Sequence, residues 1–89
     1  VFVAAVNDEV RQEALAIAAR LRGLRIPCDV DVKHKSLAKQ LEYADSLGIP
    51  YVLVIGPREV ETDRFKLRDM RKRTEETLAL EEIFKRLSG

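Results

Sequence analysis

This 89-residue chain has one cysteine, one histidine and no tryptophan. A lone Cys28 forms neither an internal disulfide nor a CxxC pair for redox chemistry or zinc binding. His34 is the only histidine, and an exposed polar loop residue is favoured over a catalytic base or a metal ligand. We therefore predict no catalytic residue, no metal site and no cofactor within this chain.

Long apolar runs and glycine-rich loops are missing as well. No apolar stretch reaches the ~18 residues that span a bilayer, and no signal-peptide pattern is present, so we expect a cytoplasmic protein without a membrane partner. The first turn reads Asn7-Asp8-Glu9, which matches neither the dinucleotide-binding nor the P-loop glycine pattern. The chain begins at Val1, directly in an apolar run, and we expect residues 1–89 to be a single domain excised from a larger protein.

Charge is nearly balanced overall but unevenly distributed. The formal net charge of +1 does not by itself indicate a nucleic-acid partner. Residues 64–73 nevertheless hold six basic side chains and one acid, whereas residues 75–82 hold four acids. A second basic group comprises Lys33, His34, Lys35 and Lys39. A solvated surface remains the alternative explanation for each of these groups.

Hydrophobic periodicity in the first part of the chain predicts alternating strands and helices. Strands are expected over residues 1–6, 28–32 and 49–55, and helices over 8–22 and 37–47. The run at 1–6 is continuously apolar, as in a central parallel strand, whereas apolar and acidic residues alternate in 28–32, as in an edge strand.

Capping residues mark the ends of the predicted helices. Gly23 is expected to end the first helix, Ser36 to cap the second and Gly48 to end it. The second helix is expected to bury the stripe Leu37, Leu41, Ala44 and Leu47.

The remaining residues predict a short helical turn, a hairpin and a last helix. The turn is expected over 57–63, followed by a strand over 64–68, a tight turn at 71–74, a returning strand over 75–80 and a helix over 81–88. Basic residues alternate with apolar ones in 64–68, so this strand is predicted to have a basic outer face.

These elements predict an α/β fold, a three-layer sandwich with a five-stranded mixed sheet and helices on both faces. Right-handed crossovers place the first strand between the second and third, and the hairpin adds an antiparallel pair. Ligands of such sheets bind beyond the carboxyl ends of the strands. Three loops are expected to meet there, Asn7-Asp8, Lys33-His34-Lys35 and Gly56-Pro57-Arg58-Glu59, and two of them carry positive charge, which favours an anionic ligand.

The most specific signature is the run of residues 36–56, which reads SLAKQLEYADSLGIPYVLVIG. It resembles the C-terminal anticodon-binding domain of histidyl-tRNA synthetases, in the anticodon-binding domain family of class II synthetases. Supporting features are the Gly56-x-x-Glu59 turn, the Leu67-Arg68-Asp69-Met70 strand and the closing Leu80-Glu81-Glu82-Ile83 helix start.

The resemblance implies recognition of the anticodon loop of a histidine-accepting tRNA. It also implies a parent histidine-tRNA ligase that acts as a homodimer, and whose catalytic domain uses ATP and Mg²⁺; its motifs are not in these residues. The present chain is expected to bind and orient tRNA without aminoacylating it.

Candidate tRNA-binding residues follow from the resemblance and from the loop positions. In related domains, an acid at the position of Glu59 and an arginine at that of Arg68 contact anticodon bases; a surface ion pair between the two is the alternative. The basic loop Lys33-His34-Lys35 and the neighbouring Arg58 are expected to position the RNA backbone. Tyr43 and Tyr51 are expected to be partly buried packing residues rather than base stackers.

Two other functions remain open from the sequence. The same fold serves in synthetase-like regulatory or accessory proteins that make protein contacts without charging tRNA. A small-molecule or phosphate-binding α/β domain is the second alternative, and salt dependence distinguishes it because contacts to several phosphates weaken steeply with salt.

Overall fold

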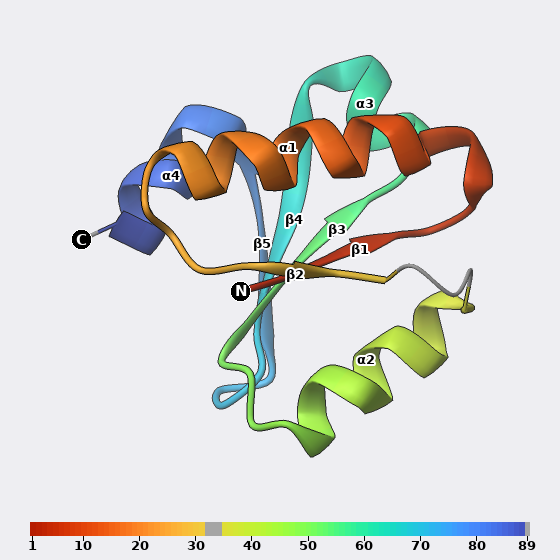
Figure 1. The fold of residues 1–89 in the computed structure, drawn as a ribbon, viewed down its shortest axis with the longest axis vertical. Helices are drawn as coiled ribbons and strands as arrows, with labels where there is room; N and C mark the ends of the chain where they lie inside the picture. The colour runs from red at the N-terminus through yellow and green to blue at the C-terminus, as the bar shows by residue number, and fades with distance from the viewer. Residues whose placement is uncertain (32–34, 89) are drawn as a thin grey trace.

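The computed structural model describes residues 1–31 and 35–88 as five strands and five helical segments (Figure 1). The strands are β1 (Phe2–Ala5), β2 (Asp29–Val30), β3 (Tyr51–Ile55), β4 (Arg64–Asp69) and β5 (Thr74–Ala79). The helical segments are a 3₁₀ turn η1 (Asp8–Val10), then α1 (Arg11–Gly23), α2 (Leu37–Ser46), α3 (Pro57–Thr62) and α4 (Leu80–Ser88). None of the helices in these described ranges is long and apolar enough to cross a membrane.

The strands form one mixed sheet in the order β2-β1-β3-β4-β5. β1 pairs in parallel with β2 and β3, whereas β3–β4 and β4–β5 are antiparallel. The predicted sheet and its central first strand are therefore confirmed. The predicted edge strand is shorter than expected, because only Asp29 and Val30 of the range 28–32 are paired, and Val32 lies outside the described residues.

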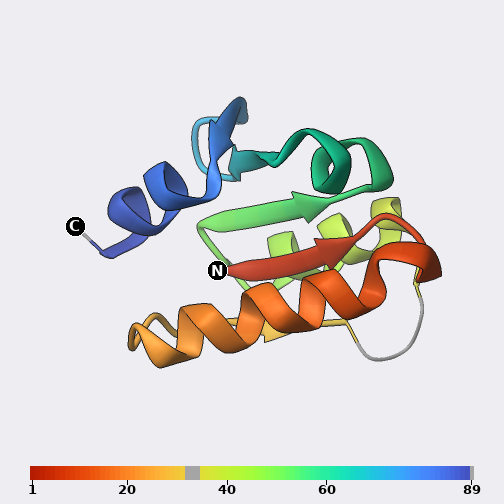
Figure 2. The same ribbon diagram turned by 90° about the horizontal axis from the view of Figure 1, so that it is seen from above.

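Helices cover the two faces of the sheet unequally. α1 and α4 lie on one face, called here the α1 face, and α2 lies alone on the other, the α2 face (Figures 1 and 2). Side chains alternate along β1, so that Val3 and Ala5 belong to the core of the α1 face while Phe2 and Ala4 belong to that of the α2 face.

The core of the α1 face is the larger of the two. It joins buried residues of α1, α4 and strands β1, β3 and β4, among them Leu21, Leu53, Ile55, Phe65 and Ile83. The core of the α2 face consists of Phe2, Ala4, Ala44, Val52 and Val54. Since these last residues come only from β1, β3 and α2, the single helix α2 covers the middle of its face and leaves the outer strands open.

The two long helices before β2 and β3 end in the same motif. The Gly48 N–H donates to the Asp45 carbonyl and the Ile49 N–H to the Ala44 carbonyl, with Gly48 left-handed at φ +70°, as predicted for a glycine that ends a helix.

At the end of α1 the prediction is wrong in detail, because Gly23 is the last helical residue and Arg25 takes the left-handed position at φ 63°. The left-handed residue thus lies two positions after the predicted glycine, and the residue that follows it, the buried Ile26, donates its N–H to the Leu21 carbonyl.

The buried face of α2 differs from the predicted stripe. Ser36 caps the helix as predicted, its Oγ accepting from the Lys39 N–H at 3.3 Å, and Ala44 is fully buried. Leu47, however, is 55% exposed at the C-cap of α2, although its backbone N–H still donates to the Tyr43 carbonyl. Gln40 takes a buried position instead, and Leu37 and Leu41 are only partly buried against the α2-face core.

Candidate nucleic-acid interface

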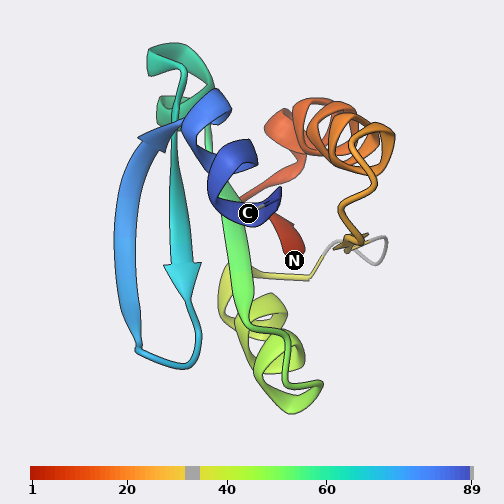
Figure 3. The ribbon, with the colours of Figure 1, turned by 90° about the vertical axis from the view of Figure 1, so that its left-hand side faces the viewer.

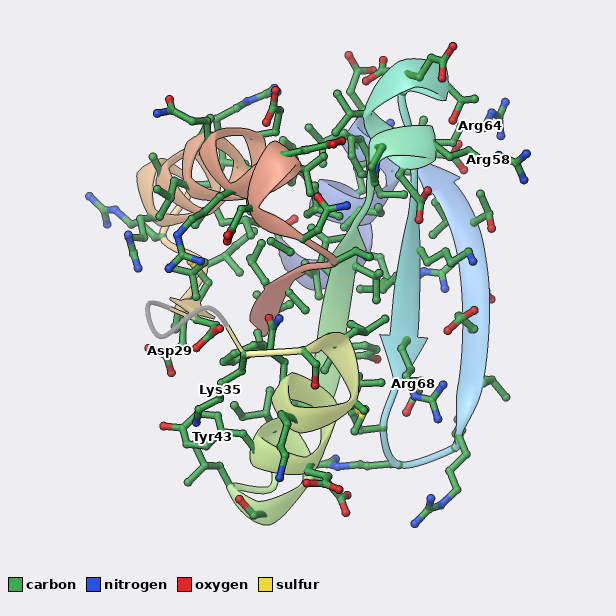
Figure 4. The ribbon with its side chains drawn as sticks, turned by 90° about the vertical axis from the view of Figure 1, so that its right-hand side faces the viewer. Asp29, Lys35, Tyr43, Arg58, Arg64 and Arg68 are labelled. Carbon is green, nitrogen blue, oxygen red and sulfur yellow. The ribbon has the colours of Figure 1, made fainter. Side chains whose placement is uncertain are left out.

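The open part of the α2 face carries the basic side chains of β4 (Figure 4). Arg68 lies opposite Val52 and Lys66 opposite Val54 in the antiparallel register, so the basic residues share the face of these core valines. The alternate residues Phe65 and Leu67 are buried on the α1 face. The predicted strand with one basic face is thus confirmed, and Figure 3 shows the β4–β5 hairpin standing beside α2 rather than beneath it.

Two cations of this face are available to a ligand. Arg64 and Lys66 are exposed, and neither forms an ion pair with any residue in the described ranges. Each lies opposite an uncharged residue of β5, Ala79 and Thr77 respectively. Their charges therefore remain uncompensated within the described sheet, which is the arrangement expected of a phosphate-binding surface.

Arg68 differs from these two because it has a carboxylate neighbour. Its Nη1 lies 3.5 Å from Glu75 Oε2, directly across the β4–β5 ladder, and its Nε is buried with no hydrogen-bond partner in residues 1–31 and 35–88. The side chain retains 32% exposure, so its guanidinium borders solvent. A groove beside it is lined by α2 and the hairpin, with Leu41, Met70 and Arg73 among the lining residues.

Glu59 and Arg58 lie at the opposite end of β4 from Arg68. Both are in the first turn of α3, which follows the carboxyl end of β3, whereas Arg68 lies opposite Val52 near the start of β3. Glu59 makes no ion pair with a described residue, and Arg58 is exposed and points away from the sheet (Figure 4). The structure therefore does not bring Glu59 and Arg68 together, and the ion pair of Arg68 is with Glu75.

Gly56 shapes the loop that holds Glu59. A Cβ at this glycine would lie 3.1 Å from Glu59 Oε1 and 3.3 Å from Val6 Cγ2. The Glu59 carboxylate thus lies over the glycine, next to the end of β1, where the Val6 N–H donates to the Ile55 carbonyl at 2.8 Å. This contact joins the loops that follow β1 and β3, as the parallel pairing of these strands predicts.

Lys35 is the described member of the predicted basic loop, since Lys33 and His34 lie outside the described residues. Its backbone N–H donates to Asp31 Oδ2 at 2.7 Å. Lys35 also lines a hollow at the carboxyl end of β1, together with Ala5, Val6, Asn7 and Ser36. Two of the three predicted loops, those after β1 and before α2, therefore meet in one hollow.

Gln40 is a site residue that the sequence did not reveal. It is the one buried polar or charged side chain in the described part of the chain, with 2% exposure. Its Nε2 donates to the Ala5 carbonyl at 2.9 Å and to the Lys35 carbonyl at 2.8 Å. Gln40 thereby ties the start of α2 and the backbone of Lys35 to the end of β1. No periodicity signals such a residue, because its partners are distant carbonyls.

The predicted burial of the tyrosines is half right. Tyr51 is partly buried and packs against the α1-face core. Tyr43 is 44% exposed, and its ring packs edge-on against Phe2 with the ring centroids 5.8 Å apart. The difference follows from the position of Tyr43 on α2, where the ring overhangs the edge of the core instead of entering it.

Comparison with known protein families decides the class of this domain. The family model described as "Anticodon binding domain" matches residues 1–89, the whole chain. The chain belongs to the anticodon-binding domain family. The resemblance that residues 36–56 carry in the sequence is therefore confirmed.

Sequence relatives of this anticodon-binding domain are histidine–tRNA ligases. It is 36% identical to the enzyme of Thermococcus kodakarensis over 93% of the chain, and 34% identical to that of Methanosarcina acetivorans over 86%. The chain spans only 20% and 18% of the length of these two relatives. A relative from Anaeromyxobacter sp. (strain K) is 36% identical over the whole of this chain, which spans 22% of that relative's length.

Solved structures show the same fold. S. aureus histidyl-tRNA synthetase in its apo form superposes with a TM-score of 0.89 at 25% identity, over 99% of this domain and 23% of that chain. The RNA-binding domain of threonyl-tRNA synthetase from Cryptosporidium parvum gives a TM-score of 0.90 at 20% identity, over 98% of this domain and 22% of that chain. The three-layer α/β sandwich is thus the architecture of synthetase anticodon-binding domains.

Proposed function

We propose that this anticodon-binding domain recognises the anticodon loop of a histidine-accepting tRNA and orients it for a catalytic domain elsewhere in the parent protein. The observation that carries the proposal is the open basic half of the α2 face, where Arg64 and Lys66 have no partner among the described residues. The histidine–tRNA ligase relatives support the choice of tRNA.

The positions of the charged residues suggest two kinds of RNA contact, to phosphates and to bases. Arg64, Lys66 and Arg58 are exposed and suited to phosphates, which fix the register of an RNA without reading its sequence. Arg68 and Glu59 are partly buried and suited to base edges, since a guanidinium donates two parallel hydrogen bonds and a carboxylate accepts from an amino group.

The two base-reading candidates act on different nucleotides in this proposal. Within β4, Arg64 and Arg68 are four residues apart, which is roughly 13 Å of extended strand. Glu59 lies in α3, just before the Arg64 end of β4. We therefore assign each of the two its own base of the loop. Lys35, whose ammonium lies beside the Tyr43 ring, is assigned to the RNA backbone.

The rest of the proposal concerns the parent protein. We infer a cytoplasmic, homodimeric histidine–tRNA ligase whose catalytic domain binds ATP and Mg²⁺ and performs the aminoacylation, while the present domain contributes no reacting group. The support is that the relatives are ligases of which this chain spans about a fifth.

A competition experiment tests the proposal. Binding of the chain to a labelled histidine-accepting tRNA should be displaced by the same tRNA and by its anticodon stem-loop, and poorly by a tRNA with another anticodon. Equal displacement by all tRNAs would contradict the histidine assignment. Absence of any tRNA binding would favour the regulatory or accessory alternative.

A matched pair of charge reversals tests the surface. Lys66→Glu and Lys85→Glu change the net charge equally at exposed lysines, one on the open α2 face and one on α4. We expect Lys66→Glu to weaken tRNA binding and to reduce the slope of log affinity against log salt by about 1. Lys85→Glu should leave both nearly unchanged, and equal effects of the two variants would argue against the assigned surface.

A further inference from the structure

On its other flank, α2 leaves a groove open toward the edge strand β2. Its lining includes Phe2, Asp29, Asp31, Lys35, Gln40 and Tyr43. Figure 4 shows Asp29, Lys35 and Tyr43 on one side of α2 and Arg64 and Arg68 on the other. The groove is therefore separate from the basic half of the α2 face, and its chemistry is different.

Tyr43 gives the groove an aromatic wall that is both exposed and held in place. The ring is 44% exposed, and the buried Phe2 supports it in an edge-on contact with an interplanar angle of 60°. The Lys35 ammonium lies 4.9 Å from the Tyr43 ring centroid. Proteins that bind single-stranded nucleic acids combine an aromatic ring, on which a base stacks, with cations that contact phosphates, and here the lysine cation lies over the ring itself.

The polar atoms of the groove are mainly hydrogen-bond acceptors. Asp29 lies opposite Phe2 in the parallel β1–β2 register, so it lies on the α2 face, and it makes no ion pair with any residue in the described ranges. Gln40 Nε2 donates to two carbonyls, and its Oε1 is buried without a partner among the residues that the structure describes. Together with the Asp29 carboxylate, this oxygen makes the polar side of the groove rich in acceptors.

These features select a planar ligand with N–H donors along its edge. A phosphate in the groove would meet the Asp29 carboxylate, whereas a base stacked on Tyr43 turns its edge to the acceptors. Guanine suits them best, because two adjacent N–H groups on one edge match a carboxylate.

The groove also continues the proposed interface. Asp31, Lys35 and Gln40 line both this groove and the hollow at the end of β1, so an RNA strand that occupies the hollow passes directly into the groove. We propose that the groove between β2 and α2 holds one unstacked base of the same RNA loop, guanine by preference, stacked on Tyr43 with its N–H edge toward Asp29. This inference rests on the proposed function, and it adds a base-binding site to it.

The aromatic wall is tested with Tyr43→Ala against Leu47→Ala, an exposed residue directly after α2 that does not line the groove. The probe is an anticodon stem-loop RNA carrying 2-aminopurine at one loop position at a time. For one position, fluorescence should fall on binding to the parent chain and not on binding to Tyr43→Ala, whose affinity should be about tenfold lower. Equal affinities and equal quenching in the two variants overturn the proposal, provided that both melt as the parent chain does.

Asp29→Asn tests the acceptor edge through the sign of its effect. If Asp29 accepts from a base, Asp29→Asn weakens binding, and the loss disappears when the base at the quenched position is replaced by one without an amino group. If Asp29 only repels RNA, the substitution tightens binding to all RNAs, and the proposal is overturned. If the groove variants bind RNA normally while Lys66→Glu binds it weakly, the groove proposal fails and the proposed function stands. If the parent chain binds no RNA, both proposals fail.

Discussion

The two faces of the sheet divide stability and binding between them. On the α1 face, two helices enclose a core that extends across β1, β3 and β4 and includes the fully buried Leu53 and Ile83. On the α2 face, one helix packs its Ala44 over four buried strand residues and leaves charged side chains on both flanks. A small domain has little apolar surface to bury, and this one concentrates it on one face so that the other can remain open to a ligand.

The difference has an energetic reason. An uncompensated row of cations on an edge hairpin costs the fold little while water solvates it, whereas the same row under a helix would have to be paired or neutralised. The single pair on this row, Arg68–Glu75, lies at the border with α2, where burial begins. The basic side chain next to α2 is thus paired with a carboxylate, whereas Arg64 and Lys66, on the part of the face that no described helix covers, have no such partner in the described ranges.

The largest expected effect is on the covered face. Leu53→Ala removes a fully buried side chain from the central strand β3, and we expect it to lower the free energy of unfolding by ~2–5 kcal/mol. Chemical denaturation measures the loss. Leu15→Ala, at a 43% exposed position on α1, is the control and should change stability by no more than ~0.5 kcal/mol. Similar losses in both variants would show that the α1 face does not dominate stability.

On the open face, Arg68→Ala should act on recognition instead. We expect a loss of ~1–3 kcal/mol in binding free energy toward the cognate anticodon, relaxed discrimination between anticodons and little change in melting temperature. Glu75→Gln removes the same ion pair but keeps the arginine, so it should not weaken binding. Equal losses for cognate and non-cognate anticodons in Arg68→Ala would make this residue a phosphate contact, and a loss in Glu75→Gln would make the ion pair the cause.

The sequence predicts the architecture well because it depends on local signals. Apolar periodicity, the Ser36 cap and the Gly48 stop specify the segments between β2 and β3, and a right-handed crossover orders the strands. The alternation in β4 likewise predicts which side chains face outward. All of these features depend on neighbours within a few residues.

The parts that the sequence does not predict depend on distant partners. Gln40 is buried because two carbonyls, at Ala5 and Lys35, accept from its amide, and only the folded chain brings them together. Arg68 pairs with Glu75 because of the hairpin register, whereas its spacing from Glu59 suggested a different pair. Residue spacing places side chains on an element but does not place the elements relative to each other.

Leu41→Ala probes the boundary between the two faces. Leu41 is only partly buried, beside the groove that Arg68 borders, so truncation should cost about 1–1.5 kcal/mol of stability, less than for a fully buried leucine. Thermal or chemical denaturation measures this cost. A loss as large as that of Leu53→Ala would mean that α2 covers more of its face than the structure shows.

The smallest expected effect belongs to Arg73, at the tip of the open hairpin. Arg73→Ala should weaken binding to every tRNA by about 0.5 kcal/mol without changing anticodon discrimination, because an exposed cation on the hairpin turn makes at most a screened phosphate contact.

The Arg73 backbone is left-handed at φ 55°, so Arg73→Gly is the sharper variant, because glycine adopts that conformation without strain while the charged side chain is removed. Arg71→Ala, on the same turn but outside the groove beside α2, is the matched control for removing one hairpin cation. If Arg73→Gly relaxes discrimination as Arg68→Ala does, the hairpin tip reads bases, and the base-reading part of the α2 face extends beyond β4.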